Sequence, residues 1–308
     1  MTIVGDIMLG RRVGDAAAAA GDAAAPLRPM QDRLAAADIT VGNLESTLSD
    51  EGAPRQGTDS FAADPRVLHG LEDAGFDVLS LANNHTGDYG DHALRQTLHR
   101  IENSSIARLG AGRNRSGAWR PVVIERNGVR FGFVAFNAIG ETPPATPTSP
   151  GAAQVRMQPR TGPLNPADLR LATRTVRRLG DRADVVIVLP HWGDQYTYEP
   201  VPDQRRVGAA LIDAGADIVV GGHPHWVQRV QRHRGRLIVH SLGNFVFDMD
   251  FSRETQEGVL AELRFVGTRL RSVRFSPYLI GDDFAPRPLH GAAGRQIVAH
   301  LGVPPTVR

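Results

Sequence analysis

Five short apolar runs in this chain each end in a polar turn that carries side chains able to bind a metal ion. The most informative is the strand-like run Ile218-Val219-Val220, because Gly221-Gly222-His223-Pro224-His225 follows it directly. The other four turns are Gly5-Asp6, Gly42-Asn43-Leu44-Glu45, Asn83-Asn84-His85 and Pro190-His191-Trp192. Ligands gather outside the carboxyl ends of the strands in an open α/β sheet, so we expect these turns to meet in one place. The pattern favours a dinuclear metal site.

The order of the expected elements points to an α/β fold. Strands are expected at 3–6, 39–41, 76–81, 107–109, 184–189 and 217–220, and they alternate with helices at 26–36, 64–74, 91–101, 166–180 and 203–214. Asp64 is the expected N-cap of the second helix, and Asn127-Gly128 the expected turn of a hairpin between 122–125 and 130–136. Residues 141–166, rich in Pro, Thr and Gly, are expected to form a long surface loop.

Beyond residue 225 the pattern changes to strands. Antiparallel strands are expected at 226–232, 237–242, 259–265 and 270–275, with a short helix near 296–301. Alternating elements followed by strands predict a mixed sheet or a two-sheet α/β sandwich with outer helices. We expect residues 1–280 to form one domain, with residues 281–308 as a tail packed on it.

Composition narrows the chemistry of such a site. The 308 residues include no cysteine and no lysine, so disulfides and zinc–sulfur sites are excluded, and any metal must be held by His, Asp, Glu or Asn. No apolar stretch reaches the roughly 20 residues that span a bilayer. No basic stripe with interleaved aromatic residues supports nucleic-acid binding. Without a signal-like segment at its start, the sequence as written predicts a cytoplasmic protein, or an extracellular or cell-surface one if an export signal is missing.

The polar turns together supply the groups of a two-metal hydrolytic site. Two divalent ions about 3.5–4 Å apart can clamp the attacking and leaving oxygens of a hydrolysis. Manganese, iron and zinc all suit nitrogen and oxygen ligands. The candidate ligands are the carboxylates of Asp6 and Glu45, the imidazoles of His191, His223 and His225, and the amide of Asn84. His85, beside one of these ligands, is free to donate a proton to a leaving group.

The same residues stand in motifs that resemble those of a known family. Their order is similar to that of the calcineurin-like metallophosphoesterases, and more closely to the branch named for CapA, the poly-γ-glutamate capsule protein. The matching motifs are 5–11, 42–45, 82–85 with Asp88 and Gly90, 191–193, 214–217, 222–225 and 241–245. This resemblance covers residues 3–275 and implies an α/β sandwich of metallophosphoesterase type with two divalent metal ions.

The resemblance also implies a role for each ligand. The implied ligands are Asp6 and His225 for the first metal, Asn84, His191 and His223 for the second, and Glu45 as a bridge between them. His85 would be the general acid. The wider superfamily usually places a His two residues after the first Asp, where this chain has Met8. We therefore expect the first metal site to be one ligand short, and either to bind weakly or to be empty in the isolated protein.

Some residues keep a plainer interpretation. Arg11 either binds an anionic substrate group with its planar guanidinium or forms a surface salt bridge. Asn244 lies in a tight turn and is a candidate polar contact to substrate, while Glu45 has an alternative as a solvated or helix-capping residue. The histidines outside the motifs are interpreted as structural or surface residues: His69, His92, His99, His233, His240, His290 and His300.

Two classes of function remain open from the sequence. The first is a metal-dependent hydrolase that cleaves either a γ-glutamyl bond of a poly-γ-glutamate-related compound or a phosphoester, in an anionic small-molecule or polymer substrate. The second is a non-catalytic accessory protein of poly-γ-glutamate capsule synthesis or export, with which Met8 in a ligand position is compatible. A tailoring enzyme that acts on a small peptide or nucleotide is a third alternative.

Overall fold

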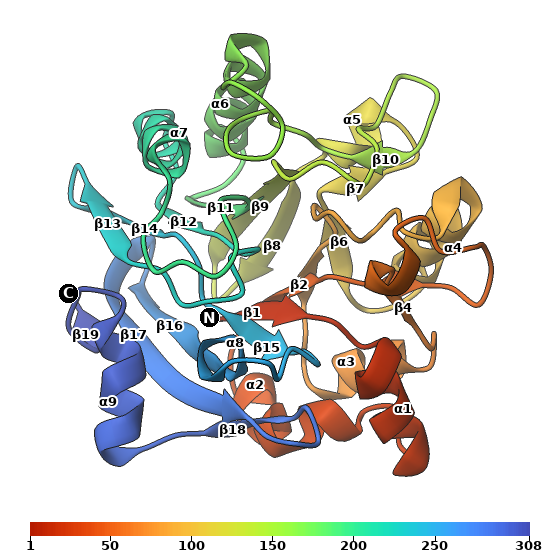
Figure 1. The fold of residues 1–308 in the computed structure, drawn as a ribbon. Helices are drawn as coiled ribbons and strands as arrows, with labels where there is room; N and C mark the ends of the chain where they lie inside the picture. Colours follow the sequence, from red (N-terminus) through yellow and green to blue (C-terminus); the bar gives the residue numbers. More distant parts are fainter.

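The computed structural model describes residues 1–308, with two large sheets packed face to face at its centre (Figure 1). The nine-stranded sheet has the order β18-β17-β16-β1-β2-β5-β6, with β15 paired to β1 and β19 paired to β17. Its strands are β1 Thr2–Ile7, β2 Thr40–Leu44, β5 Val78–Ser80, β6 Ala107–Leu109, β15 Asn244–Val246, β16 Glu257–Val266, β17 Arg269–Ile280, β18 Pro286–Pro288 and β19 Thr306–Val307.

The second sheet has six strands in the order β13-β14-β12-β11-β9-β8. They are β8 Val122–Arg126, β9 Val129–Asn137, β11 Val185–His191, β12 Ile218–Val220, β13 Val230–His233 and β14 Arg236–Val239. Two small ribbons pair β3 Thr47–Leu48 with β4 Ala62–Ala63, and β7 Ala111–Gly112 with β10 Gly151–Ala152.

Helices cover the outer faces of both sheets. The α-helices are α1 Arg11–Ala19, α2 Gln31–Ala35, α3 Val67–Asp73, α4 Gly90–Glu102, α5 Arg115–Ala118, α6 Pro166–Gly180, α7 Pro202–Asp213, α8 Arg253–Gln256 and α9 Gly291–Ala299, and two 3₁₀ helices span Ala25–Met30 and Gly57–Asp59. Figure 1 shows α6 and α7 together on the side of β11 and β12. No helix has both the length and the apolar composition needed to cross a membrane.

Three apolar clusters hold these layers together. One lies between the sheets and combines residues of β1, β2, β16 and β17 with residues of β9, β11, β12 and β14. A second packs α1, α3 and α4 on the nine-stranded sheet, and a third packs α6 and α7 on the six-stranded sheet. Successive residues of a strand point to opposite faces, so Ile3 joins the central cluster and Val4 the outer one. The expected two-sheet α/β sandwich with outer helices is confirmed.

The parallel parts of both sheets end at the same edge of the sandwich. Strands β1, β2, β5 and β6 are parallel in one sheet, and β9, β11, β12 and β14 in the other. A bridge between His191 and Gly222 continues the pairing of β11 and β12 beyond the strands. The polar turns that follow these strands therefore lie next to one another.

Some expected elements differ from the structure. The helix expected at 64–74 begins at Val67, because Asp64 and Pro65 form a turn in which Val67 N donates to Asp64 O over 3.0 Å. The helix expected at 26–36 is divided at Met30, and Pro29, which has no N–H to donate, lies inside its 3₁₀ half. Helix α9 begins five residues before the expected 296.

The strands after residue 225 are not all antiparallel. Strand β14 is antiparallel to β13 but parallel to β12. Asn244, which we expected in a tight turn, is the first residue of β15, a strand parallel to β1. The hairpin of β8 and β9 is confirmed, with Asn127 and Gly128 at φ 53° and 75°. In the last 28 residues, β18 and β19 both pair with β17, and α9 packs on β16 and β17.

Candidate metal centre

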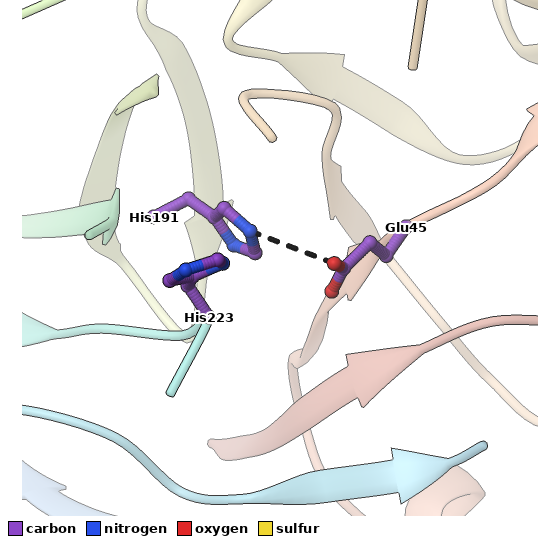
Figure 2. Close-up of side chains that lie close together, drawn as sticks. All are labelled: Glu45, His191 and His223. Atoms are coloured by element: carbon purple, nitrogen blue, oxygen red, sulfur yellow. Dashed lines mark ion pairs between the residues drawn. The ribbon is translucent and has the colours of Figure 1, made fainter. Parts of the chain in front are cut away.

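One buried cluster joins the ends of strands from both sheets. Glu45 follows β2, His191 ends β11, and His223 follows β12; one ligand atom from each lies within 4.8 Å of the others. Figure 2 shows the imidazole of His191 facing the Glu45 carboxylate, with His223 beside it. The separation between His191 Nε2 and Glu45 Oε1 is 3.6 Å, and the two imidazole centroids lie 5.0 Å apart. This grouping offers two nitrogen donors and one oxygen donor to a single cation.

Three atoms of this cluster have no partner within the protein. Glu45 Oε1 and both ring nitrogens of His223 are buried without a hydrogen bond. A buried polar atom that lacks a partner costs about 1–3 kcal/mol, and such atoms are rare in folded proteins. A divalent cation would satisfy the carboxylate oxygen and one imidazole nitrogen at once, so the residues present fit a metal.

Burial keeps the imidazoles neutral, which is the form that binds metals. Loss of hydration lowers the pKa of His191 and of His223 well below the ordinary histidine value. Burial and then the neighbouring carboxyls of Asp6, Asp88 and Glu141 raise the pKa of Glu45 well above its ordinary value. Without a counter-ion these carboxyl groups repel one another, and a divalent cation would relieve that repulsion.

Asn84 lies in the turn after β5 and completes this group. Its Oδ1 is 2.8 Å from His191 Nε2, and its Nδ2 donates a hydrogen bond of 2.7 Å to Glu141 Oε2. Asn83 has a different task, because its Nδ2 donates to Asn43 Oδ1 and to the Leu44 carbonyl and its Oδ1 accepts from backbone N–H groups of its own turn.

Asp6 is fully buried at the end of β1, and both its oxygens already accept hydrogen bonds. Oδ1 accepts from Asn43 Nδ2 over 2.8 Å and Oδ2 from the backbone N–H of His223 over 2.9 Å. Desolvation raises the pKa of Asp6 to about 6, although these two hydrogen bonds oppose the shift. Gly222 packs against this carboxylate so closely that a Cβ there would lie 2.4 Å from Oδ1.

His225 is also buried, and its Nδ1 lies 2.8 Å from Asn244 Oδ1. The Asn244 amide in turn donates to the Thr255 carbonyl over 2.9 Å. Burial lowers the pKa of His225 to about 4. With Nδ1 bound to Asn244, the nitrogen that remains for a metal is Nε2. The structure thus places Asn244, expected as a polar contact to substrate, behind an imidazole.

Met8 supplies no ligand to the first metal site that the sequence predicts. Its side chain is fully buried in the outer apolar cluster, and its sulfur accepts a hydrogen bond of 3.1 Å from Gly10 N. Asp6 and His225 are not part of the group whose ligand atoms lie within 4.8 Å of one another. The residues expected to hold the first metal are therefore less closely grouped than those expected to hold the second.

His85 is held in place on two sides. Its Nδ1 lies 2.7 Å from Asp88 Oδ2, and its ring stacks on Phe61 with 3.7 Å between centroids. Its other nitrogen, Nε2, is 3.9 Å from Glu45 Oε1. An imidazole whose Nδ1–H is bound by a carboxylate presents Nε2 to the cluster for proton transfer.

Arg11 is engaged within the protein. Its guanidinium forms a two-point ion pair with the buried carboxylate of Asp248, and lies over the ring of Phe61 at 4.5 Å from the centroid. Of the two roles open from the sequence, the structure provides contacts for the salt bridge. The guanidinium also fixes the ring on which His85 stacks.

Two residues near the cluster were not predicted from the sequence to be functional. Asp88 was visible as part of a motif but without a role, and Glu141 stood in a loop with no periodicity to reveal it. Glu141 has φ 62°, and His223 and His225 have φ 96° and 60°. Non-glycine residues rarely adopt such angles, and they concentrate at functional sites.

Comparison with known proteins shows which family this chain resembles. The sequence profile of the family described as "Bacterial capsule synthesis protein PGA_cap" matches residues 1–249. The capsule biosynthesis protein CapA of Bacillus anthracis is 33% identical over 280 residues, covering 89% of this chain and 66% of that protein. The PGA biosynthesis protein CapA of Bacillus subtilis (strain 168) is 31% identical over 265 residues, covering 85% of this chain and 66% of that protein. The chain thus spans about two-thirds of the length of these relatives.

A solved structure shares the fold at low sequence identity. The Staphylococcus aureus structure titled "Putative 5'-Nucleotidase" superposes with a TM-score of 0.50 at 14% identity, covering 86% of this chain and 49% of that chain. The two chains therefore share a fold, in agreement with the expected two-sheet α/β sandwich.

Proposed function

The chain belongs to the family of bacterial capsule synthesis proteins known as PGA_cap, and we propose that it is a metal-dependent hydrolase with a dinuclear site. Its substrate would be an anionic compound with a γ-glutamyl bond related to poly-γ-glutamate, or a phosphoester. The observation that carries the proposal is the set of buried, unpartnered ligand atoms on Glu45 and His223 within reach of His191.

Each residue has a defined task in this proposal. Glu45, Asn84, His191 and His223 would hold the second metal, Asp6 and His225 the first, and Glu45 would bridge the two. Bound metals of this kind polarise the scissile group and lower the pKa of bound water. Manganese, iron and zinc all suit this donor set.

The remaining steps fall to the chain itself. Asp88 orients His85 through the 2.7 Å contact at Nδ1, so that Nε2 faces the cluster and donates a proton to the leaving atom. Phe61 covers the imidazole ring on one face and excludes water from it. His85 is only 6% exposed, so most of its surface is shielded from solvent.

Metal content and turnover, measured together, test the proposal. Metals are counted by mass spectrometry in wild type and His223→Ala, and hydrolysis of a generic phosphodiester and of a γ-glutamyl peptide is assayed on the same samples. We expect bound metal and turnover to be lost together in the variant. His69→Ala is the matched control, because the His69 side chain is 85% exposed.

The second candidate is a non-catalytic accessory protein of capsule synthesis or export. It is favoured by Met8, whose sulfur is bound to a backbone N–H and leaves the first metal a ligand short. Folded protein that binds manganese, turns over neither substrate and retains a stable partner in pull-down would establish this alternative.

A further inference from the structure

The loop between β9 and α6 brings one more carboxylate to the metal centre, that of Glu141. Its Oε2 accepts the 2.7 Å hydrogen bond from Asn84 Nδ2, and its Oε1 accepts a 2.8 Å hydrogen bond from Arg160 Nη2. Asn84 is 3% exposed, and the Glu141 side chain is 29% exposed. The carboxylate thus closes the outer side of a buried ligand.

Other contacts hold this part of the loop against the turn that carries Asn84. The Asn137 amide, at the end of β9, donates to the Asn83 carbonyl over 3.2 Å. The backbone N–H of Gly87 donates to Thr142 Oγ1 over 2.9 Å. Between these ties Glu141 keeps a left-handed backbone, which costs a non-glycine residue about 1–2 kcal/mol. The fold therefore maintains the Glu141 position at a cost.

The hydrogen bond between Glu141 and Asn84 determines which end of the Asn84 amide faces Glu141. The two ends of an asparagine amide have nearly the same shape, but one donates hydrogen bonds and the other accepts them. An ionised carboxylate only accepts, so the nitrogen end of Asn84 must face Glu141. The oxygen end is then left 2.8 Å from His191 Nε2, on the side where a cation would lie. The opposite orientation would present an NH₂ group, which cannot bind a metal.

We propose that Glu141 is a positioning residue that holds the Asn84 amide with its oxygen toward the second metal. This inference rests on the proposed metal centre. Arg160 takes up the other carboxylate oxygen, so that Glu141 stays behind Asn84 and does not become a ligand itself. Partners of this kind behind a metal ligand typically change metal affinity by about 10–100-fold.

Two substitutions separate the effect of the Asn84 amide orientation from the effect of the Glu141 charge. Glu141→Ala removes both the acceptor and the charge, whereas Glu141→Gln removes the charge and keeps an oxygen that can accept from Asn84 Nδ2. Manganese affinity of the metal-free full chain is measured by titration calorimetry. We expect Glu141→Ala to weaken binding about 10–100-fold, and Glu141→Gln by less than about 10-fold. Equal losses in both variants would overturn the proposal, because the charge alone would then explain them.

Thr142→Val is the matched control for loop anchoring, since it removes the tie to Gly87 and leaves Glu141 intact. Its manganese affinity should stay close to that of wild type. A loss as large as that of Glu141→Ala would show that the loop, and not the amide contact, matters. Unchanged affinity in Glu141→Ala, with wild type binding normally, would refute this proposal alone.

A second measurement needs no metal. The side-chain NH₂ of Asn84, assigned by NMR from its absence in Asn84→Ala, should exchange slowly in metal-free wild type and in Glu141→Gln, and fast in Glu141→Ala. Wild type that binds no manganese would overturn the metal centre and with it the role of Glu141, even if slow exchange verified the hydrogen bond. The two failures are therefore distinguishable.

Discussion

Gly222 lies where the two sheets meet, and replacing it with alanine should disturb the proposed metal centre directly. Its backbone N–H donates to the Pro190 carbonyl, and its carbonyl accepts from Trp192 N, so the main chain cannot shift freely. A Cβ at this position would lie 2.4 Å from Asp6 Oδ1, closer than real Cβ atoms approach any neighbour. The φ of Gly222 is not positive, so the conflict comes from contact and not from backbone strain.

The cost of Gly222→Ala can be worked from what holds Asp6. A short, buried carboxylate has few alternative rotamers, and moving it breaks one of its two hydrogen bonds, from Asn43 Nδ2 or from His223 N. Overpacking a core costs about 1–3 kcal/mol, and a hydrogen bond to a charged group contributes about 1.5–3 kcal/mol. Because the two costs partly overlap, we expect the free energy of unfolding to fall by about 2–4 kcal/mol. Urea unfolding of the metal-free protein measures it.

Gly180→Ala is the control for this experiment. Gly180 ends α6 with no atom within 4 Å of an added Cβ and no positive φ. The free energy of unfolding of Gly180→Ala should therefore differ from that of wild type by no more than about 1 kcal/mol. Manganese affinity should fall in Gly222→Ala and not in Gly180→Ala. A free energy of unfolding for Gly222→Ala within about 0.5 kcal/mol of the wild-type value would refute the view that Asp6 is held rigidly.

Two further outcomes are expected from buried histidines. Burial lowers the pKa of His240 from 6.5 to about 3. Below pH 6.5 the unfolded chain therefore binds a proton that the folded chain does not bind, and the free energy of unfolding falls as the pH drops toward 3. Between pH 7.5 and 4.5 wild type should lose about 3 kcal/mol more than His240→Gln in urea unfolding; parallel losses would contradict this. For the active site, Asp88→Asn should lower turnover about 100-fold or more by releasing His85, while metal content by mass spectrometry stays unchanged. A parallel loss of metal would instead make Asp88 part of the metal site.

The convergence of the polar turns could be predicted because it depends on local patterns. Short apolar runs followed by turns identify strand ends, and the parallel strands of an α/β sheet bring their carboxyl ends to one edge. Glu45, His191 and His223 therefore come together from segments nearly 180 residues apart. Helix α6 and the β8–β9 hairpin were equally visible, because amphipathic period and Asn-Gly turns are local signals.

The features that could not be predicted from the sequence depend on contacts between distant segments. Strand β15 is only three residues long and exists because it pairs with β1, some 240 residues earlier. The start of α3 was misplaced because Asp64 accepts from Arg66 N in a turn before the helix. No sequence pattern identifies Glu141, because the role of this single loop carboxylate depends on its hydrogen bond with Asn84, which is distant in the sequence.

The two proposed metal sites differ in how far the protein itself satisfies their ligand atoms. Glu45 Oε1 and the His223 nitrogens are unpartnered, so a cation at the second position displaces only the hydrogen bond between His191 Nε2 and Asn84 Oδ1. At the first position both oxygens of Asp6 already accept hydrogen bonds, and Met8 supplies no nitrogen. Binding of the first metal must share or replace such bonds, each of which contributes about 1.5–3 kcal/mol when charged.

This inequality predicts two separate binding events when the metal-free protein is titrated with manganese. Since 1.4 kcal/mol corresponds to a factor of ten, the dissociation constants should differ by about 10-fold or more. His223→Ala should remove the tighter event and His225→Ala the weaker one, as followed by titration calorimetry. Two events of equal affinity, or loss of the tighter event in His225→Ala, would show that the hydrogen bonds of Asp6 do not limit the first site.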